Sequence, residues 1–105
     1  MSDYLRIPED FFDRKEMLIL ESLEDGYLYA DIFLKLCLKS IRTGGVLYLF
    51  EDDDYYIQAL AEMTRHEPDV INEALSVFVD LGLIEVDSTT LIILMLKKAD
   101  THSKE

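Results

Sequence analysis

The sequence predicts a mainly α-helical domain with a small antiparallel β-sheet, arranged as a winged helix-turn-helix. Two amphipathic stretches, 55–64 and 68–81, flank a three-residue turn and have the apolar spacing of helices. Two β-prone runs, 83–86 and 91–96, follow directly and are close enough to form a hairpin, the wing. A third short β-prone run, 46–50, precedes the helices and is expected to pair with that hairpin.

The length of 105 residues suits a single domain with one hydrophobic core. We expect residues 1–96 to form the winged-helix domain and residues 97–105 to be a polar tail or the start of a linker. Half of the residues are hydrophobic, which favours a globular chain despite its charge. With one cysteine, the chain cannot form an internal disulfide.

The N-terminal third is expected to contain a strand followed by a helix. The alternation in Tyr4–Ile7 predicts a short strand. Asp10 or Asp13 is placed to cap a helix that runs to about Leu23, and Gly26 suits the left-handed position that closes it. The apolar residues of this helix are expected to face inward: Met17, Leu18, Leu20 and also Ile19.

The second helix, from Tyr27 to about Arg42, is the most apolar. Its polar residues recur one turn apart and form one narrow stripe: Asp31, Lys35, Lys39 and Arg42. The rest of its circumference is apolar, so it is either a central core helix or part of an oligomer interface. Cys37 lies in that apolar arc, and we expect it to be a small buried hydrophobe.

The helix-turn-helix follows. Asp54 suits the N-cap of the helix over 55–64, and Pro68 suits the first position of the next helix, which Gly82 ends. The turn between them is Arg65-His66-Glu67, and its histidine is expected to be solvated.

The charge of this half is unusual for a helix-turn-helix. The chain has a net charge of −12. Residues 51–90 contain eleven carboxylates and a single arginine, so they contribute −10 of that net charge. Eight of these acids are expected to make an acidic face that binds a basic protein: Glu51, Asp52, Asp53, Asp54, Asp69, Glu73, Asp80 and Asp87.

DNA binding remains an alternative. A helix-turn-helix reads bases with its second helix, where Asn72 and Ser76 are the candidate base contacts, with Arg65 in the turn. Phosphate binding needs cations, and the sequence has none from Asp69 to Leu96. DNA contact through another surface would use the remaining cations: Arg14, Lys15, Lys35, Lys39 and Arg42.

Several stretches resemble the N-terminal domain of phage replisome organiser proteins. The most specific are Asp10-Phe11-Phe12-Asp13-Arg14-Lys15 and Gly26-Tyr27-Leu28-Tyr29. The resemblance extends over residues 4–96 and includes further matching positions: Tyr4-Leu5-Arg6-Ile7, Glu16, Leu34-Lys35-Leu36, Gly44-Gly45, Ala74-Leu75, Phe78 and Leu81-Gly82-Leu83-Ile84-Glu85. It implies a winged-helix fold related to DnaD-like primosome proteins. It also implies a role in phage replication, in origin recognition or replisome building, often as an oligomer.

The function expected is therefore non-enzymatic: protein–protein interaction in the initiation of phage or mobile-element replication. One alternative is a stand-alone acidic protein that imitates DNA and inhibits a host nucleic-acid-binding effector, of the anti-CRISPR or anti-restriction type. Another is sequence-specific origin binding by the helix-turn-helix. We find no phosphate-binding loop, nucleophile motif or metal-ligand spacing, so we expect no cofactor and no metal. The chain is expected to act in the cytoplasm of a bacterial host, away from membranes, with a basic protein or a second copy of itself as partner.

Overall fold

The computed structural model describes residues 4–48, 53–87 and 90–94. Four α-helices, two 3₁₀ helices and three strands follow one another in these residues, and the fold is the predicted winged helix. Its elements are, in order: η1 Phe11–Asp13, α1 Lys15–Ser22, α2 Gly26–Lys39, η2 Ile41–Thr43, β1 Val46–Tyr48, α3 Asp53–Thr64, α4 Pro68–Asp80, β2 Ile84–Val86 and β3 Thr90–Ile93.

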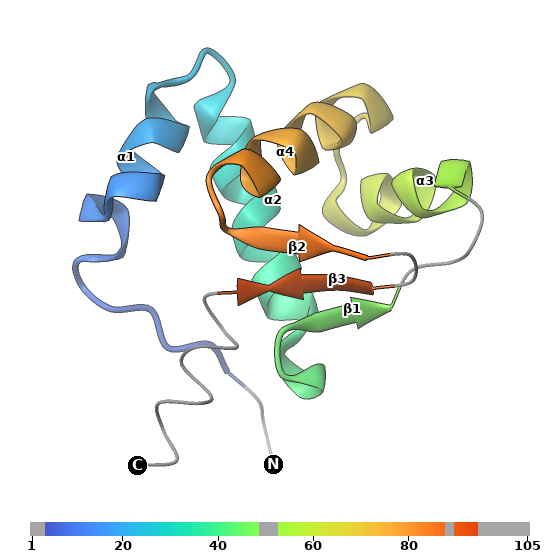
Figure 1. Ribbon diagram of the computed structural model, residues 1–105, viewed down its shortest axis with the longest axis horizontal. Helices are drawn as coiled ribbons and strands as arrows, with labels where there is room; N and C mark the ends of the chain where they lie inside the picture. The colour runs from blue at the N-terminus through green and yellow to red at the C-terminus, as the bar shows by residue number, and fades with distance from the viewer. Residues whose placement is uncertain (1–3, 49–52, 88–89, 95–105) are drawn as a thin grey trace.

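α2 lies at the centre of the molecule. It packs against α1 on one side and against α3 and α4 on the other, and the sheet lies across its C-terminal half (Figure 1). Seven of its residues are buried, among them Ile32, Phe33 and Leu36 with no exposed surface. The expectation of a central core helix is confirmed, because most of the apolar arc of α2 is buried in the core of its own chain, although Tyr27 and Leu38 are exposed.

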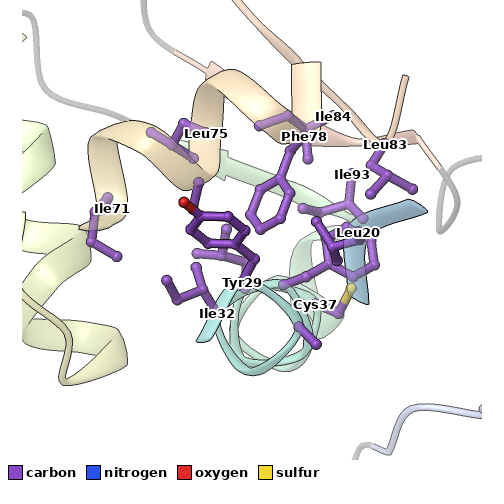
Figure 2. Close-up of a cluster of buried hydrophobic side chains, with 14 of the residues drawn as sticks. Leu20, Tyr29, Ile32, Cys37, Ile71, Leu75, Phe78, Leu83, Ile84 and Ile93 are labelled. Carbon is purple, nitrogen blue, oxygen red and sulfur yellow. The ribbon is translucent and has the colours of Figure 1, made fainter. Parts of the chain in front are cut away.

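The core joins α2 to α4 and the sheet. Ile71, Leu75 and Phe78 of α4 point toward the side chains of α2, among them Tyr29 and Ile32 (Figure 2). The apolar residues of α4 recur at three- and four-residue intervals, which sets the rotation of the helix about its axis. The residues between them, including the acids, are consequently turned to solvent.

The sheet has the strand order β1-β3-β2, and both pairings are antiparallel. Val86 pairs with Leu91 in the β2–β3 hairpin, and Val46 pairs with Ile92 across β1 and β3. The wing hairpin and its pairing with the strand before the helix-turn-helix are therefore confirmed. β2 begins at Ile84, one residue later than predicted, and residues 49–50 and 95–96 of the other two predicted strands lie outside the described residues.

The N-terminal predictions were partly wrong. Residues 4–8 have no regular secondary structure, and they pair with none of the strands β1, β2 and β3 of the described sheet. The predicted first helix is divided, because Arg14 has extended backbone between η1 and α1. Neither Asp10 nor Asp13 caps a helix with its side chain, and Arg14 occupies the N-cap of α1.

The inward face of α1 is narrower than predicted. Met17 and Leu20 are fully buried, whereas Leu18 and Ile19 are 55% and 40% exposed. The two buried residues are three positions apart, so their burial turns the intervening pair outward. α2 is shorter than expected, because it ends at Lys39 and buried Ser40 donates its hydroxyl hydrogen to the carbonyl of Cys37. Cys37 is buried as predicted, and burial raises the pKa of its thiol to about 12.

Gly26 was also misassigned. It is the first residue of α2 rather than the left-handed end of the preceding helix. Its role is steric, because a Cβ at this position would meet the backbone of Leu20 and Glu21 in α1. The left-handed glycines are Gly44, Gly45 and Gly82, and Gly82 ends α4 as expected.

The turn between α3 and α4 contains a strained residue. Arg65 has a φ of 62°, in the left-handed region that side chains other than glycine and asparagine disfavour. We expect Arg65→Gly to be about 1 kcal/mol more stable than Arg65→Ala, because both lack the long side chain and only alanine retains the Cβ. Urea denaturation of the two variants measures this difference. Equal midpoints would show that the turn tolerates the Cβ without strain.

Candidate partner-binding surface

The outer face of α4 is the candidate binding surface. In a winged helix this is the second helix of the helix-turn-helix, and α3 and the wing flank it (Figure 1). The side chains predicted to read bases, Asn72 and Ser76, are exposed on this face. The Ser76 hydroxyl donates to the backbone carbonyl of Asn72 at 3.3 Å. Three of the predicted acids share the same face and are also exposed: Asp69, Glu73 and Asp80.

The other predicted acids are less well placed or fall outside the description. Asp87 is exposed and directly follows β2, where its backbone N–H donates to the Thr90 carbonyl at 2.8 Å and closes the hairpin. Glu51 and Asp52 lie outside the described residues. Asp53 and Asp54 belong to the first turn of α3, so Asp54 lies inside the helix rather than at its N-cap. Their side chains are not among those described.

A groove crosses this surface between α4, β2 and the N-terminal part of α3. It has a volume of about 300 Å³ and is lined by residues that sequence analysis did not group together: Tyr56, Asn72, Leu75, Ser76, Val79, Asp80 and Val86. Leu75 is 6% exposed, whereas Val79 and Val86 are 47% and 39% exposed. The surface therefore combines a groove of mixed apolar and polar lining with carboxylates on the same helix face.

The predicted cations do not gather on this surface. Arg14 and Lys15 lie where α1 begins, Lys39 ends α2, and Arg42 is in η2. Arg65 is exposed in the turn that precedes α4. Neither α4 nor the two strands of the wing contain a lysine or arginine.

Lys35 already has partners within the fold. Its ammonium group pairs with Asp31 at 2.8 Å and donates to the backbone carbonyl of Thr64 at 2.8 Å. Asp31 also accepts a hydrogen bond from Nε2 of His66 at 2.7 Å, because an ionised carboxylate only accepts. His66 is therefore not the solvated turn histidine that we expected, and its side chain is 12% exposed. The contacts among Asp31, Lys35 and His66 connect α2 to the C-terminal end of α3 and to the turn between α3 and α4.

These contacts lower the pKa of Asp31. The hydrogen bond from Lys35 contributes most and that from His66 comes second, while partial burial opposes both. A carboxyl group whose pKa is lower in the folded state stabilises the fold above its unfolded pKa, here near 3.8. That contribution is lost as the pH falls through the folded value. It is small, because 47% of the Asp31 side chain is exposed and solvent screens the pairs.

Asp31→Asn is therefore expected to lower the melting temperature at pH 7 and to have progressively less effect below about pH 4. Thermal denaturation across this pH range measures the effect. Glu62→Gln is the matched control, since it removes the same charge from an exposed position of α3. A constant difference between Asp31→Asn and the parent chain at every pH would contradict the assignment.

The electrostatics of the α4 face oppose DNA. A carboxylate about 4 Å from a phosphate is repelled by about 1 kcal/mol in water and about 4 kcal/mol at a protein surface. Three such groups lie on the helix that would enter the major groove, with no cation on the wing to release counterions. The same charges attract Lys and Arg side chains.

Within the described ranges, no three His, Cys, Asp or Glu side chains are arranged to hold a metal ion. None of the helices in that part of the chain combines the length and the apolar character that a membrane crossing requires.

A known protein family matches nearly the whole chain. Residues 4–105 match the family model described as the N-terminal phage replisome organiser. Searches of the curated proteins and of the solved structures returned no match.

Proposed function

Because this chain belongs to the family of N-terminal phage replisome organiser domains, we propose that it acts in the initiation of replication by binding a basic protein partner. It does so without catalysis, in the cytoplasm of the bacterial host. The observation that carries this proposal is the α4 face, where Asp69, Glu73 and Asp80 are exposed and the sequence has no lysine or arginine from His66 to Leu96.

Charge of one sign on one face favours fast association with a partner of the opposite sign. The attraction is screened over about 10 Å at 0.1 M salt, so binding through this face depends on ionic strength. The fold supports this use of the surface, because the buried residues of α4 hold its acids outward as one array.

The experiment compares two variants with the same change in charge. One is D69N/E73Q/D80N, on α4. The other is E9Q/D10N/D13N, whose residues are exposed near the N-terminus. Each is tested by biolayer interferometry, at 50 and 300 mM salt, against the purified initiator, helicase loader and helicase of the phage and its host. We expect the α4 variant to lose about tenfold in affinity for one of these proteins at low salt. Equal losses in both variants would remove the α4 face from the proposal.

A titration with duplex DNA separates this proposal from origin recognition. We expect no measurable binding at 25 mM salt, because the α4 face repels phosphates. Tight binding that weakens steeply with salt would restore the DNA reader. Replacing Asn72 and Ser76, or Arg14, Lys15, Lys39 and Arg42, would then identify the surface used.

A second candidate function follows from the spacing of the acids. Asp69, Glu73 and Asp80 lie at intervals of four and seven residues on one exposed helix face, and such an array can occupy a basic nucleic-acid channel. In this function the chain is a DNA mimic that inhibits a host effector of the CRISPR or restriction type. A competition experiment distinguishes the two functions. Duplex DNA is expected to displace a DNA mimic from its effector. It is not expected to displace this chain from a replication partner that binds it at a site away from the partner's own DNA channel.

Self-association is the remaining partner hypothesis. The apolar arc of α2 is largely buried in the core, apart from Tyr27 and Leu38, so we place the contact with a second copy on the exposed apolar residues of α1 and on the residue that follows it. Leu18, Ile19 and Leu23 are 55%, 40% and 38% exposed. Light scattering of the parent chain and of Leu18→Glu measures the effect. A monomeric parent chain at 100 μM would exclude this interface.

A further inference from the structure

The groove beside α4 has exposed apolar side chains in its lining, next to polar ones. Val79 is nearly half exposed on a helix whose other apolar residues are buried or half-buried, and Val86 is exposed at the end of β2. Leu75 forms the buried floor between them, and Tyr56 of α3 contributes to the lining. When a partner covers apolar side chains that are exposed to water, the removal of that apolar surface from water favours binding.

The dimensions of the groove limit what it can hold. Its volume of about 300 Å³ is at the lower end of the range of ligand pockets, and it is open to solvent. That space suits one large apolar side chain, such as leucine, methionine or phenylalanine. The polar groups of Asn72 and Ser76 line the same groove and can bond to the backbone of a bound segment.

The charge around the groove selects among such segments. Asp80 lines the groove, and Asp69 and Glu73 share its face of α4. Glu85 does not, since it alternates with Ile84 and Val86 and lies on the opposite face of the sheet. A segment that inserts an apolar residue here places its neighbouring residues against carboxylates, so lysine and arginine are favoured at those positions.

We propose that this groove receives one apolar side chain from a lysine- or arginine-rich segment of the partner protein. The inference rests on the proposed function, because it names the part of the basic partner that the α4 face recognises. The carboxylates attract the segment, and the groove selects its apolar residue. A purely basic segment is held by charge alone, and a purely apolar one lacks the attraction.

Three synthetic peptides of eleven residues test this. The first has six lysines and a central leucine, the second has alanine in place of that leucine, and the third keeps the leucine but replaces the lysines with serines. Each is titrated into the full chain at 25 mM salt and followed by NMR of backbone amides and valine methyls. We expect the first peptide to bind about tenfold more tightly than the second. Only the first is expected to shift the methyl resonances of both Val79 and Val86.

The variant V79S/V86S provides the second arm. It removes apolar surface at two exposed positions and leaves the charge unchanged. We expect it to bind the leucine and alanine peptides equally, with the affinity that the parent chain has for the alanine peptide. Leu38→Ser is the matched control, because Leu38 is 53% exposed on α2 outside the groove. It is expected to keep the tenfold preference.

The outcomes separate the two proposals. Equal affinities for the leucine and alanine peptides in the parent chain would overturn the groove proposal and leave the acidic surface as a charge-only contact. If neither basic peptide binds at low salt, the proposed function fails as well. Binding of the serine peptide as tight as that of the lysine peptide would overturn the requirement for a basic segment. A change in oligomeric state in V79S/V86S would assign the groove to a second copy of the chain and overturn the proposal.

Discussion

Replacing Phe78 with alanine is expected to destabilise the domain by about 3 to 5 kcal/mol. Phe78 is fully buried, and its ring meets that of Phe33 edge to face with 5.4 Å between the ring centroids. The ring therefore joins α4 to α2, and its removal leaves a cavity that neighbouring side chains fill only in part. For a domain of this size the loss corresponds to a fall in melting temperature of about 15 to 30 °C.

Circular dichroism during thermal and urea denaturation measures the Phe78→Ala effect. Phe12→Ala is the control, since Phe12 is 41% exposed and contacts Phe11 edge to face at 4.9 Å. We expect its cost to stay near 1 kcal/mol. Because Phe78 also holds the acids of α4 outward, Phe78→Ala should weaken partner binding even where the chain remains folded. A cost for Phe78→Ala no larger than that for Phe12→Ala would show that α4 does not depend on this contact.

Gly26→Ala is expected to destabilise the domain by about 1 to 3 kcal/mol, against the usual preference of helices for alanine. The added Cβ would meet the carbonyl oxygen of Leu20, and it would lie 2.8 Å from both the Cα and the carbonyl oxygen of Glu21. These are backbone atoms, so relief requires α1 and α2 to move apart. That movement disturbs the packing of Met17 and Leu20, which are fully buried.

Gly44→Ala distinguishes steric crowding from backbone strain. Gly44 has a φ of 65°, and no heavy atom lies within 4 Å of a Cβ built there. Its replacement costs only the left-handed conformation, about 1 kcal/mol. The two variants are compared by their urea midpoints and by hydrogen exchange of α1. Faster exchange in α1 is expected for Gly26→Ala alone, and a Gly26→Ala variant as stable as the parent would contradict the close approach.

The sequence predicted the C-terminal half of the fold better than the N-terminal third, for a physical reason. Pro68, Gly82 and the helical spacing of α4 are local signals, and they indicate the helix limits without knowledge of any tertiary contact. Arg14 carries no such signal, yet its extended backbone separates η1 from α1. The strand predicted over Tyr4–Ile7 had the right alternation, but a strand also requires a neighbouring strand, which a residue pattern does not reveal.

The charge of the candidate binding surface could be predicted from the sequence, whereas its shape could not. The exposed acids of α4 followed from helical spacing alone. The groove needed the tertiary structure, because Tyr56, Val79 and Val86 come from three different elements. The pairing of Asp31 with His66 also went unpredicted, because 35 residues separate them and the only local signal was the one-turn spacing of Asp31 and Lys35.

The buried thiol of Cys37 makes the chain a reporter of its own opening. With a pKa of about 12, only about one thiol in ten thousand is ionised at pH 8 in the folded state, and 2% of the residue is exposed. A thiol reagent therefore reacts only when α2 separates from its neighbours, and Cys37 is the single cysteine of the chain. The rate of thiol labelling therefore reports how often the core opens, and it can be measured in dilute solution without denaturant. A ligand bound beside α4 would lower this labelling rate in proportion to its occupancy.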